Sequence, residues 1–463
     1  MQKLNSQRIK HDISSKRISL VLRLFLFSFG IFFLRSIWLT LLNPSEDKLK
    51  QIKKNQYHHN SNSMSYRGTL FDHRRVPLAI SIKAPSLALN PKIFSPGKIE
   101  RKKLSKLLKV PESKIKNLSK KESYFSWLKR KVSYETAEKV KALKIKGLYT
   151  LLEPSRFYPG QTAASQIIGL VGTDNIGLLG LEKILNTELS GTEEKVQKLK
   201  DARGKSILTK SSLVTPQVPG NHVYLTLDHV IQGITEEALD KKFKESGALS
   251  AFAIVADPHT GRILAVANRP SFNPNKTENL LLANTKNLAS NMSFEPGSVI
   301  KPFVIAGALE TDKTSLYELN DCESSGRYKV SRNAFIHDEH PKKHPITTED
   351  VIVHSSNICT YKIAKKLGKE ALYKTLDKFG IGKEFEHIKL PGMRKGSVSP
   401  YEFWREIRFA NISFGQGLLS TGLEMIRAYS AFANGGYLIE PYLIERIESA
   451  EGEVLQGPPR TKE

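Results

Sequence analysis

The chain has 463 residues, of which 40% are hydrophobic and 25% charged, a composition typical of globular and not of disordered proteins. This length predicts two or three domains. The formal net charge of +25 would suit a nucleic-acid partner, but much of the lysine excess lies between residues 98 and 146, mixed with glutamate and apolar residues at helical spacing. We interpret this stretch as the solvated faces of short helices. Because no zinc-finger, RNP-type or basic-zipper pattern is found either, we expect no nucleic-acid partner.

The two cysteines, Cys322 and Cys359, are too few for a disulfide scaffold. A single disulfide between them is possible, but the sequence cannot show that their Cα atoms lie close enough. We therefore favour two buried free thiols. No set of metal ligands occurs at a familiar spacing, so we expect no metal.

The stretch 18–42 is the one segment long enough to cross a bilayer, which needs about 20 largely apolar residues. Arg23 and Arg35 interrupt it near its two ends, where long side chains can reach the interface. The basic residues among 1–17 favour a cytoplasmic tail, and residues 35–39 make a poor signal-peptidase site. We expect an uncleaved single-pass helix in the cytoplasmic membrane, with the N-terminus inside and the bulk of the chain in the periplasm.

Composition divides the rest of the chain into three parts. Residues 43–65 are polar and are interpreted as a linker. Residues 66–215 mix short predicted strands and helices that glycine and proline separate. Near Pro216 the composition shifts again, and residues 216–463 form the last part.

The last part opens with clear local patterns. Val223–Asp228 alternates like a strand, and Val230–Glu245 then has helical periodicity. Ser250–Asp257 and Arg262–Ala267 predict two strands joined by a tight turn. The remainder is predicted to be mostly helix and loop.

A Ser-x-x-Lys pair, Ser298 and Lys301, follows a Pro-Gly break. We expect Ser298 at the N-terminus of a helix, where the helix dipole stabilises a developing negative charge. Lys301 would lie on the same helical face, and a desolvated lysine amine can accept a hydroxyl proton near neutral pH. The spacing alone is a weak signal because it occurs elsewhere in this lysine-rich chain. The Pro-Gly lead-in and the apolar continuation distinguish Ser298.

A second candidate element is Ser355-Ser356-Asn357, at a predicted loop-to-helix junction. The Ser355 hydroxyl could relay a proton to a leaving amine, and the Asn357 amide could fix a substrate carbonyl. Serine and asparagine are also the residues that cap helix N-termini. On spacing alone, the cap is the favoured interpretation.

The segment FEPGSVIKPF, residues 294–303, closely resembles the active-site serine segment of class B penicillin-binding proteins, and Ser355-Ser356-Asn357 resembles their second motif. The agreement continues in order over roughly residues 30–445. The Glu-Pro-Gly-Ser form resembles the division branch of the family more than the elongation branch. Further matching segments are RGTLFD (67–72), RFYP (156–159), DARG (201–204), DPHTGRILA (257–265), SFGQG (413–417) and ANGG (433–436).

The resemblance implies an α+β fold. After the transmembrane helix, a pedestal domain of the dimerisation type would occupy residues 66–215. A transpeptidase domain, an antiparallel sheet with helices, would occupy residues 216–463.

The resemblance also implies a peptidoglycan D,D-transpeptidase of septal cell-wall synthesis. Ser298 would attack a stem peptide and form an acyl-enzyme, with Lys301 as the base. Ser355 and Asn357 would assist and position the substrate. β-Lactams would acylate the same serine, no metal or cofactor would be needed, and the expected partners are membrane proteins of cell division.

The family's third motif, Lys-Ser/Thr-Gly on a strand of the active site, does not occur in this sequence. We therefore expect a transpeptidase domain without its C-terminal strands, in which the hairpin over residues 250–267 is what remains of a five-stranded sheet. Three accounts stay open. The chain is an active enzyme, a catalytically inactive scaffold anchored in the division complex, or one of two chains that together complete the domain.

Overall fold

A computed structural model of the chain describes residues 2–38, 58–63, 65–192, 194–200, 206–207 and 218–459. The chain divides into two units. One comprises Met1–Ser63 with Glu194–Pro216, and the other comprises Met64–Glu193 with Gln217–Glu463. Most of the predicted linker, residues 43–65, lies outside the described residues.

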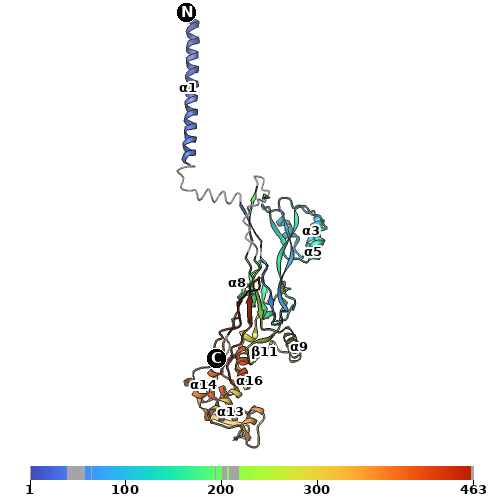
Figure 1. Ribbon diagram of the computed structural model, residues 1–463, viewed down its shortest axis with the longest axis vertical. Coiled ribbons are helices and arrows are strands. Elements are labelled where there is room, and N and C mark those ends of the chain that lie inside the picture. Colours follow the sequence, from blue (N-terminus) through green and yellow to red (C-terminus); the bar gives the residue numbers. More distant parts are fainter. Residues whose placement is uncertain are drawn as a thin grey trace. The chain divides into compact units, whose positions relative to one another are not determined.

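The first unit contains the apolar helix α1, Gln2–Ile37 (Figure 1). Its part Ile18–Ile37 has a mean hydropathy of 2.0 and none of it is buried. Twenty helical residues span about 30 Å, the thickness of a bilayer core. The helix begins at Gln2, so most of the predicted tail 1–17 continues into the span as one helix, while the predicted end at residue 42 lies outside the described residues.

The first unit also contains a small antiparallel sheet. Its strands are β1 (His58–Ser63), β8 (Glu194–Lys200) and β9 (Ser206–Ile207), in the order β1-β8-β9. β1 lies within the stretch interpreted as a linker. A run of His, Asn and Ser carries no apolar alternation, so its pairing with β8 could not be predicted from local sequence.

The second unit is built on a seven-stranded sheet whose path is β20-β19-β10-β2-β3-β4, with β5 paired to β3. The central strand β3 runs antiparallel to β5, from Ile80 opposite Phe157 to Leu89 opposite Leu148. Near the other edge, β19 from the end of the chain pairs antiparallel with β10. Strands from the predicted pedestal and from residues after 216 therefore share one sheet. The strands are β2 (Leu70–Phe71), β3 (Pro77–Leu89), β4 (Ser126–Lys129), β5 (Leu148–Phe157), β10 (His222–Leu225), β19 (Ile444–Glu448) and β20 (Val454–Gln456).

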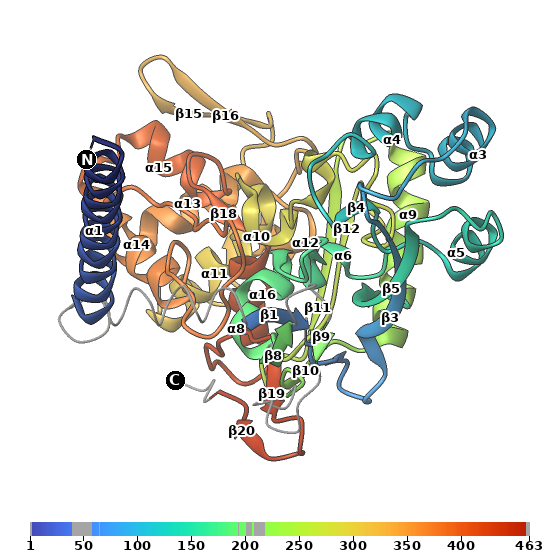
Figure 2. The same ribbon diagram turned by 90° about the horizontal axis from the view of Figure 1, so that it is seen from above.

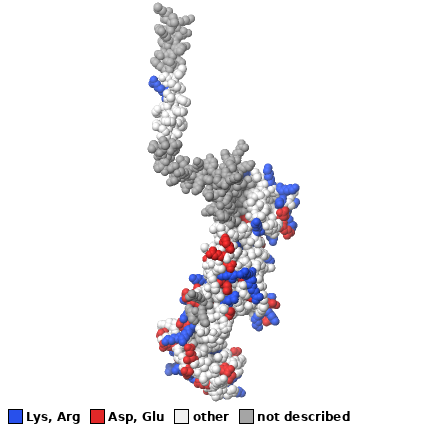
Figure 3. Space-filling view, viewed as in Figure 1, with Lys and Arg blue, Asp and Glu red and all other residues white. Residues whose placement is uncertain are grey.

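The lysine-rich stretch forms the helices α3 (Lys98–Leu108), α4 (Glu112–Leu118) and α5 (Tyr134–Lys141). Their apolar residues, such as Leu104 and Val140, are buried in one core cluster. Figure 3 shows basic side chains, with acidic ones among them, over the end of the unit where α3 and α5 lie in Figure 1. The prediction of short helices with solvated charged faces is confirmed.

A buried charge cluster joins two of the segments that carried the family resemblance, RGTLFD and RFYP, to Glu182. Arg67 Nη2 lies 2.9 Å from Glu182 Oε2, and Arg156 Nε lies 2.6 Å from Glu182 Oε1. All three side chains are at most 2% exposed. Glu182 comes from α7, within a group of short elements beside the sheet. These elements are α6 (Ser165–Ile168), β6 (Leu170–Val171), β7 (Gly177–Leu179), α7 (Gly180–Ile184) and α8 (Asn186–Leu189).

The predicted helix and hairpin after residue 216 are present. α9 spans His229–Ser246, and β11 (Ala251–Ala256) pairs antiparallel with β12 (Ile263–Arg269). Figure 2 shows α9 on one side of this pair, with α10 (Leu288–Asn291) and α16 (Gly422–Ala433) on the other. The expected sheet between helices is thus represented by two strands in the described residues.

The remaining helices pack around a core that includes Phe303, Tyr361 and Phe409. Figure 2 shows the hairpin β15–β16 beside α13 and α15. The helices are α11 (Lys301–Glu310), α12 (Thr348–Val353), α13 (Asn357–Leu367), α14 (Lys369–Lys378) and α15 (Glu406–Ser413), with the 3₁₀ turns η2 (Leu282–Thr285), η3 (Gly297–Ile300) and η4 (Tyr401–Phe403). The paired strands are β13 (Ser293–Phe294) with β18 (Ser420–Thr421), β14 (Leu319–Asn320) with β17 (Ile346–Thr347), and β15 (Arg327–Ser331) with β16 (Ala334–His337).

The two cysteines are joined. Cys322 and Cys359 form a disulfide with their Cα atoms 5.0 Å apart, and both residues are buried. The prediction of two free thiols is therefore wrong, although their burial is as expected. Cys322 follows β14 and Cys359 lies in the first turn of α13. Their approach depends on packing between distant segments that no local pattern records.

Candidate active site

Ser298 lies in the 3₁₀ turn η3 and is exposed. The sequence predicted the first turn of an α-helix, but α11 begins only at Lys301. In a 3₁₀ turn, residues three apart are eclipsed, so Ser298 and Lys301 still lie on one side of the chain. Gly297 precedes the serine with φ +63°, a conformation that glycine adopts without steric cost.

The turn η3, which contains Ser298, is held by hydrogen bonds to the segment SFGQG and to α16. Gly297 N donates to Gly415 O at 2.9 Å, and Tyr429 Oη donates to Val299 O at 2.6 Å. A Cβ on Gly415 would lie 2.0 Å from Gly297 O, so only glycine fits there. The pairing of β13 with β18 fixes the chain just before the turn.

Lys301 is buried, with 1% of its surface exposed. Its Nζ donates to Ser355 O at 2.5 Å and to Ser355 Oγ at 2.9 Å. Burial lowers the pKa of Lys301 to about 8, while the charge of Asp338 acts in the opposite direction. Near that pH a large fraction of the amine is neutral and can accept a proton.

Ser355 adopts a left-handed backbone conformation, with φ +54°, which is uncommon for residues other than glycine. Ser355 N donates to Ile352 O, and Ser356 N donates to Val351 O, both at 3.1 Å. These bonds close the turn at the end of α12. The conformation directs both the carbonyl oxygen and the hydroxyl of Ser355 to the Lys301 amine, and such strained residues are concentrated at functional sites.

Neighbouring serines cap helix α13 and bind the lysine: Ser356 is the N-cap, and Ser355 accepts hydrogen bonds from Lys301. Ser356 caps α13, with its Oγ accepting from Cys359 N at 3.0 Å. The Ser356 hydroxyl also donates to Asp338 Oδ2 at 2.6 Å, and Ile358 N donates to Asp338 Oδ1 at 2.9 Å. Asp338, just after β16, was not predicted, because no spacing links it to the Ser-Ser-Asn segment.

Asn357 is the first residue of α13 and is half-buried. Its Nδ2 donates to His337 O at 2.9 Å. The structure thus joins Lys301 and Ser355 directly, with Ser298 in the turn that leads to Lys301. Within the described residues, no hydrogen bond links the Ser298 side chain to the other three.

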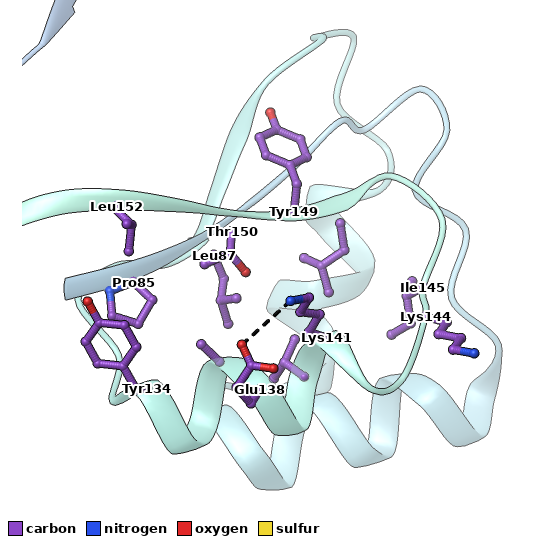
Figure 4. Close-up of a pocket in the computed structure, with 13 residues that line it drawn as sticks. Pro85, Leu87, Tyr134, Glu138, Lys141, Lys144, Ile145, Tyr149, Thr150 and Leu152 are labelled. Carbon is purple, nitrogen blue, oxygen red and sulfur yellow. Dashed lines mark ion pairs between the residues drawn. The ribbon is translucent and has the colours of Figure 1, made fainter. Parts of the chain in front are cut away.

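One cavity among the described residues is separate from this constellation. It has a volume of about 440 Å³ and lies between α5 and the strands β3 and β5 (Figure 4). Its wall is mostly apolar, and an ion pair of 3.8 Å joins Glu138 to Lys141 at its side. None of the four candidate site residues lines it. In the described part of the chain, no group of three or more His, Cys, Asp or Glu is placed to hold a metal ion.

Two family models match the chain. Residues 62–225 match the "Penicillin-binding Protein dimerisation domain" and residues 251–463 match the "Penicillin binding protein transpeptidase domain". The probable peptidoglycan D,D-transpeptidase PenA of Neisseria gonorrhoeae is 32% identical over 441 residues, which cover 94% of this chain and 74% of PenA. The peptidoglycan D,D-transpeptidase FtsI of Escherichia coli is 27% identical over 459 residues, covering 96% of this chain and 75% of FtsI.

Solved structures of penicillin-binding proteins also match this chain. Penicillin binding protein 3 of Mycobacterium tuberculosis, complexed with aztreonam, has a TM-score of 0.63 at 27% identity and matches 87% of this chain and 71% of its own. Penicillin Binding Protein 2X of Streptococcus thermophilus has a TM-score of 0.66 over 88% of this chain and 63% of its own, and at 24% identity it shows the fold alone.

The two models place a dimerisation domain before a transpeptidase domain in this chain, and both models describe penicillin-binding proteins. This chain belongs to class B of that family, and relatives named above are peptidoglycan D,D-transpeptidases of the FtsI and PBP3 type. The family resemblance and the α+β fold inferred from the sequence are confirmed. With such relatives, the apolar helix α1 indicates a single-pass membrane anchor.

Proposed function

We propose that this protein is a peptidoglycan D,D-transpeptidase of septal wall synthesis that works through an acyl-enzyme on Ser298. The observation that carries the proposal is the buried Lys301 amine, one turn from Ser298 and bonded to both oxygens of Ser355. A lysine in water would be protonated at neutral pH, whereas burial shifts this amine towards its neutral form.

In the proposed reaction, Ser298 Oγ attacks the penultimate D-Ala carbonyl of a stem peptide and its proton passes to Lys301. The C–N bond to the terminal D-Ala then breaks, and the leaving amine takes that proton through the Ser355 hydroxyl. The amine of a neighbouring peptidoglycan strand next attacks the acyl-enzyme, forms the new amide, and returns a proton to Ser298. A β-lactam enters by the first step, with opening of its ring.

Asn357 is proposed to orient the substrate. One N–H of its amide is used by His337 O, and a primary amide has a second N–H. That second donor is available for a substrate carbonyl. The bond to His337 fixes the amide plane, which makes the remaining donor a pre-organised one.

The proposed location is the cytoplasmic membrane, with the N-terminus inside and the catalytic region in the periplasm. The basic residues before the apolar span support this orientation. The Cys322–Cys359 disulfide supports it independently, because such bonds persist mainly in oxidising compartments outside the cytosol. The Glu-Pro-Gly-Ser form of the serine segment supports a septal role, with membrane proteins of the division complex as partners.

The proposal is tested by labelling membranes that contain the full chain with a fluorescent penicillin. The Ser298→Ala variant should lose all labelling. Ser113→Ala is the matched control, because Ser113 is an exposed serine on α4 with the same spacing to a lysine, and it should label like the unaltered chain. Absence of labelling in a chain that is present in the membrane would contradict catalysis and favour the scaffold account.

A further inference from the structure

The Cys322–Cys359 disulfide is attached to the first turn of α13, the helix that begins with the last residue of the Ser-Ser-Asn segment. Cys359 is two residues beyond Asn357, and its N–H is the group that donates to the Ser356 cap. Cys322 is 1% exposed and Cys359 is fully buried. The covalent bond thus anchors the first turn of α13 to the segment that follows β14, inside the core.

The disulfide closes a loop of chain with a sequence separation of 37 residues. This loop contains the hairpin β15–β16, Asp338, strand β17, helix α12 and the whole Ser-Ser-Asn segment. The two ends of the loop meet at the disulfide, two residues after Asn357. A closed loop of this size has far fewer conformations than the same chain with free ends.

The contacts that hold the start of α13 come from within the same loop. Asp338 accepts from Ser356 Oγ and from Ile358 N, and His337 O accepts from the Asn357 amide. Near Cys322, the Asn320 amide donates to Thr348 Oγ1 at 3.0 Å, which fixes the start of α12. The bonds to Asp338 and His337 join parts of one loop to each other. The Asn320 bond ties the residues just before Cys322 to that loop, and the disulfide joins the two ends of the loop.

We propose that the Cys322–Cys359 disulfide is the positioning device of the second motif: it keeps both oxygens of Ser355 on the Lys301 amine, and acylation of Ser298 depends on it. The proposal rests on the proposed function. Its physical basis is that the Lys301–Ser355 contact joins α11 to a turn in left-handed conformation, and a misplacement of about 1 Å in such a contact can lower a rate about 100-fold.

The first test reads the position of the segment without any reaction. Hydrogen exchange of the full chain is compared before and after reduction of the disulfide with a phosphine. The disulfide gains two electrons from the phosphine and two protons from water to give two thiols, and the phosphine takes up the oxygen of that water. The amides of Ile358 and Cys359, both bonded at the start of α13, should exchange at least tenfold faster after reduction. Amides of β11 and β12 should not change. Unchanged exchange at Ile358 and Cys359 would overturn the proposal.

The second test reads the rate of acylation by fluorescent penicillin. Reduction should lower the first-order rate constant at saturating penicillin by at least tenfold, while the fraction labelled at completion stays full. A purely structural loss would do the reverse, because the fraction would fall and the surviving molecules would react at the original rate. An unchanged rate constant, or a fall in the fraction alone, would contradict positioning.

The Cys322→Ala/Cys359→Ala chain is the matched control. It should react slowly with and without the phosphine, since it has no bond to reduce. In the unaltered chain, oxidised glutathione takes back the two electrons as it splits into two thiols, and both readouts should return to their first values. If no form of the chain is acylated, the proposed function fails, whereas the exchange result still decides whether the disulfide positions the segment.

Discussion

Lys301 is surrounded by groups that act on its proton in opposite directions. Burial favours the neutral amine, whereas the carboxylate of Asp338 favours the ammonium ion. Both oxygens of Ser355 accept hydrogen bonds from the amine. The balance leaves an amine that can be neutral at physiological pH and yet remains tied to the second motif.

The pH dependence of acylation tests this balance. Because the neutral amine is the base, the acylation rate should rise with pH, with a midpoint near the Lys301 pKa of about 8. In Asp338→Asn the midpoint should move to lower pH, since the charge that raises the lysine pKa is gone while the side-chain shape is kept. The measurement is the first-order rate constant of penicillin labelling from pH 6 to 10 for both chains. A midpoint that moves upward in Asp338→Asn would refute the assigned role of the carboxylate.

At this scale, the sequence was informative where chemistry follows short spacing. Ser298 and Lys301 are three residues apart, and the 3₁₀ turn keeps them on one side of the chain as an α-helix would have done. The division of labour between Ser355 and Ser356 could not be predicted, because it depends on the left-handed backbone of Ser355. Asp338 could not be predicted either, since the fold brings it to α13 from another strand pair.

Helices and strands with a strong hydrophobic periodicity formed where the sequence predicted them. Strands that depend on pairing with distant segments could not be predicted from the sequence. α9, β11 and β12 lie within a few residues of their predicted bounds. The pairing of β19 with β10, the strand β1 and the disulfide all join segments far apart in sequence. A local hydrophobic pattern determines which face of a strand is buried, whereas the choice of a distant partner depends on tertiary packing.

The disulfide should contribute measurably to the stability of the helical elements around α13. Closing a loop with a sequence separation of 37 residues removes conformational entropy from the unfolded chain, worth roughly 4 kcal/mol. The Cys322→Ala/Cys359→Ala chain should therefore unfold at a clearly lower denaturant concentration. The probe is urea unfolding of the purified chain, followed by the exchange of α13 amides. Equal midpoints for the two chains would show that the bond does not stabilise this region.

At the scale of the whole second unit, the buried Glu182 links three segments that the sequence places far apart. Its carboxylate forms ion pairs with both Arg67 and Arg156, and the two arginine side chains are at most 2% exposed. Removal of the one anion leaves two buried cations without a counter-charge. Breaking a buried ion pair in this way typically costs about 3–5 kcal/mol.

Glu182→Gln should accordingly destabilise the unit by several kcal/mol, as measured by urea unfolding. Glu135→Gln on α5 is the matched control. Glu135 pairs with Lys139, but the two side chains are 76% and 57% exposed, and such surface pairs contribute about 0–1 kcal/mol. Similar losses in the two variants would mean that burial of the Glu182 cluster has no special weight.

The proposed orientation of the molecule is tested with protease added outside intact spheroplasts. A chain tagged at its N-terminus should lose everything beyond the membrane helix and keep a short tagged fragment. The result follows because the bulk of the chain is proposed to lie in the periplasm, with only the N-terminal tail inside. Protection of the full chain until the cells are lysed would reverse the orientation.

The central claim is that Ser298 is the nucleophile of a site completed by Lys301 and Ser355. It is tested most directly by mass spectrometry of the full chain after reaction with benzylpenicillin. The account predicts that the tryptic peptide spanning residues 287–313 gains the mass of one whole penicillin, because ring opening adds the molecule without a leaving group, and that the adduct maps to Ser298. An unmodified peptide, or an adduct on another residue, would contradict the account.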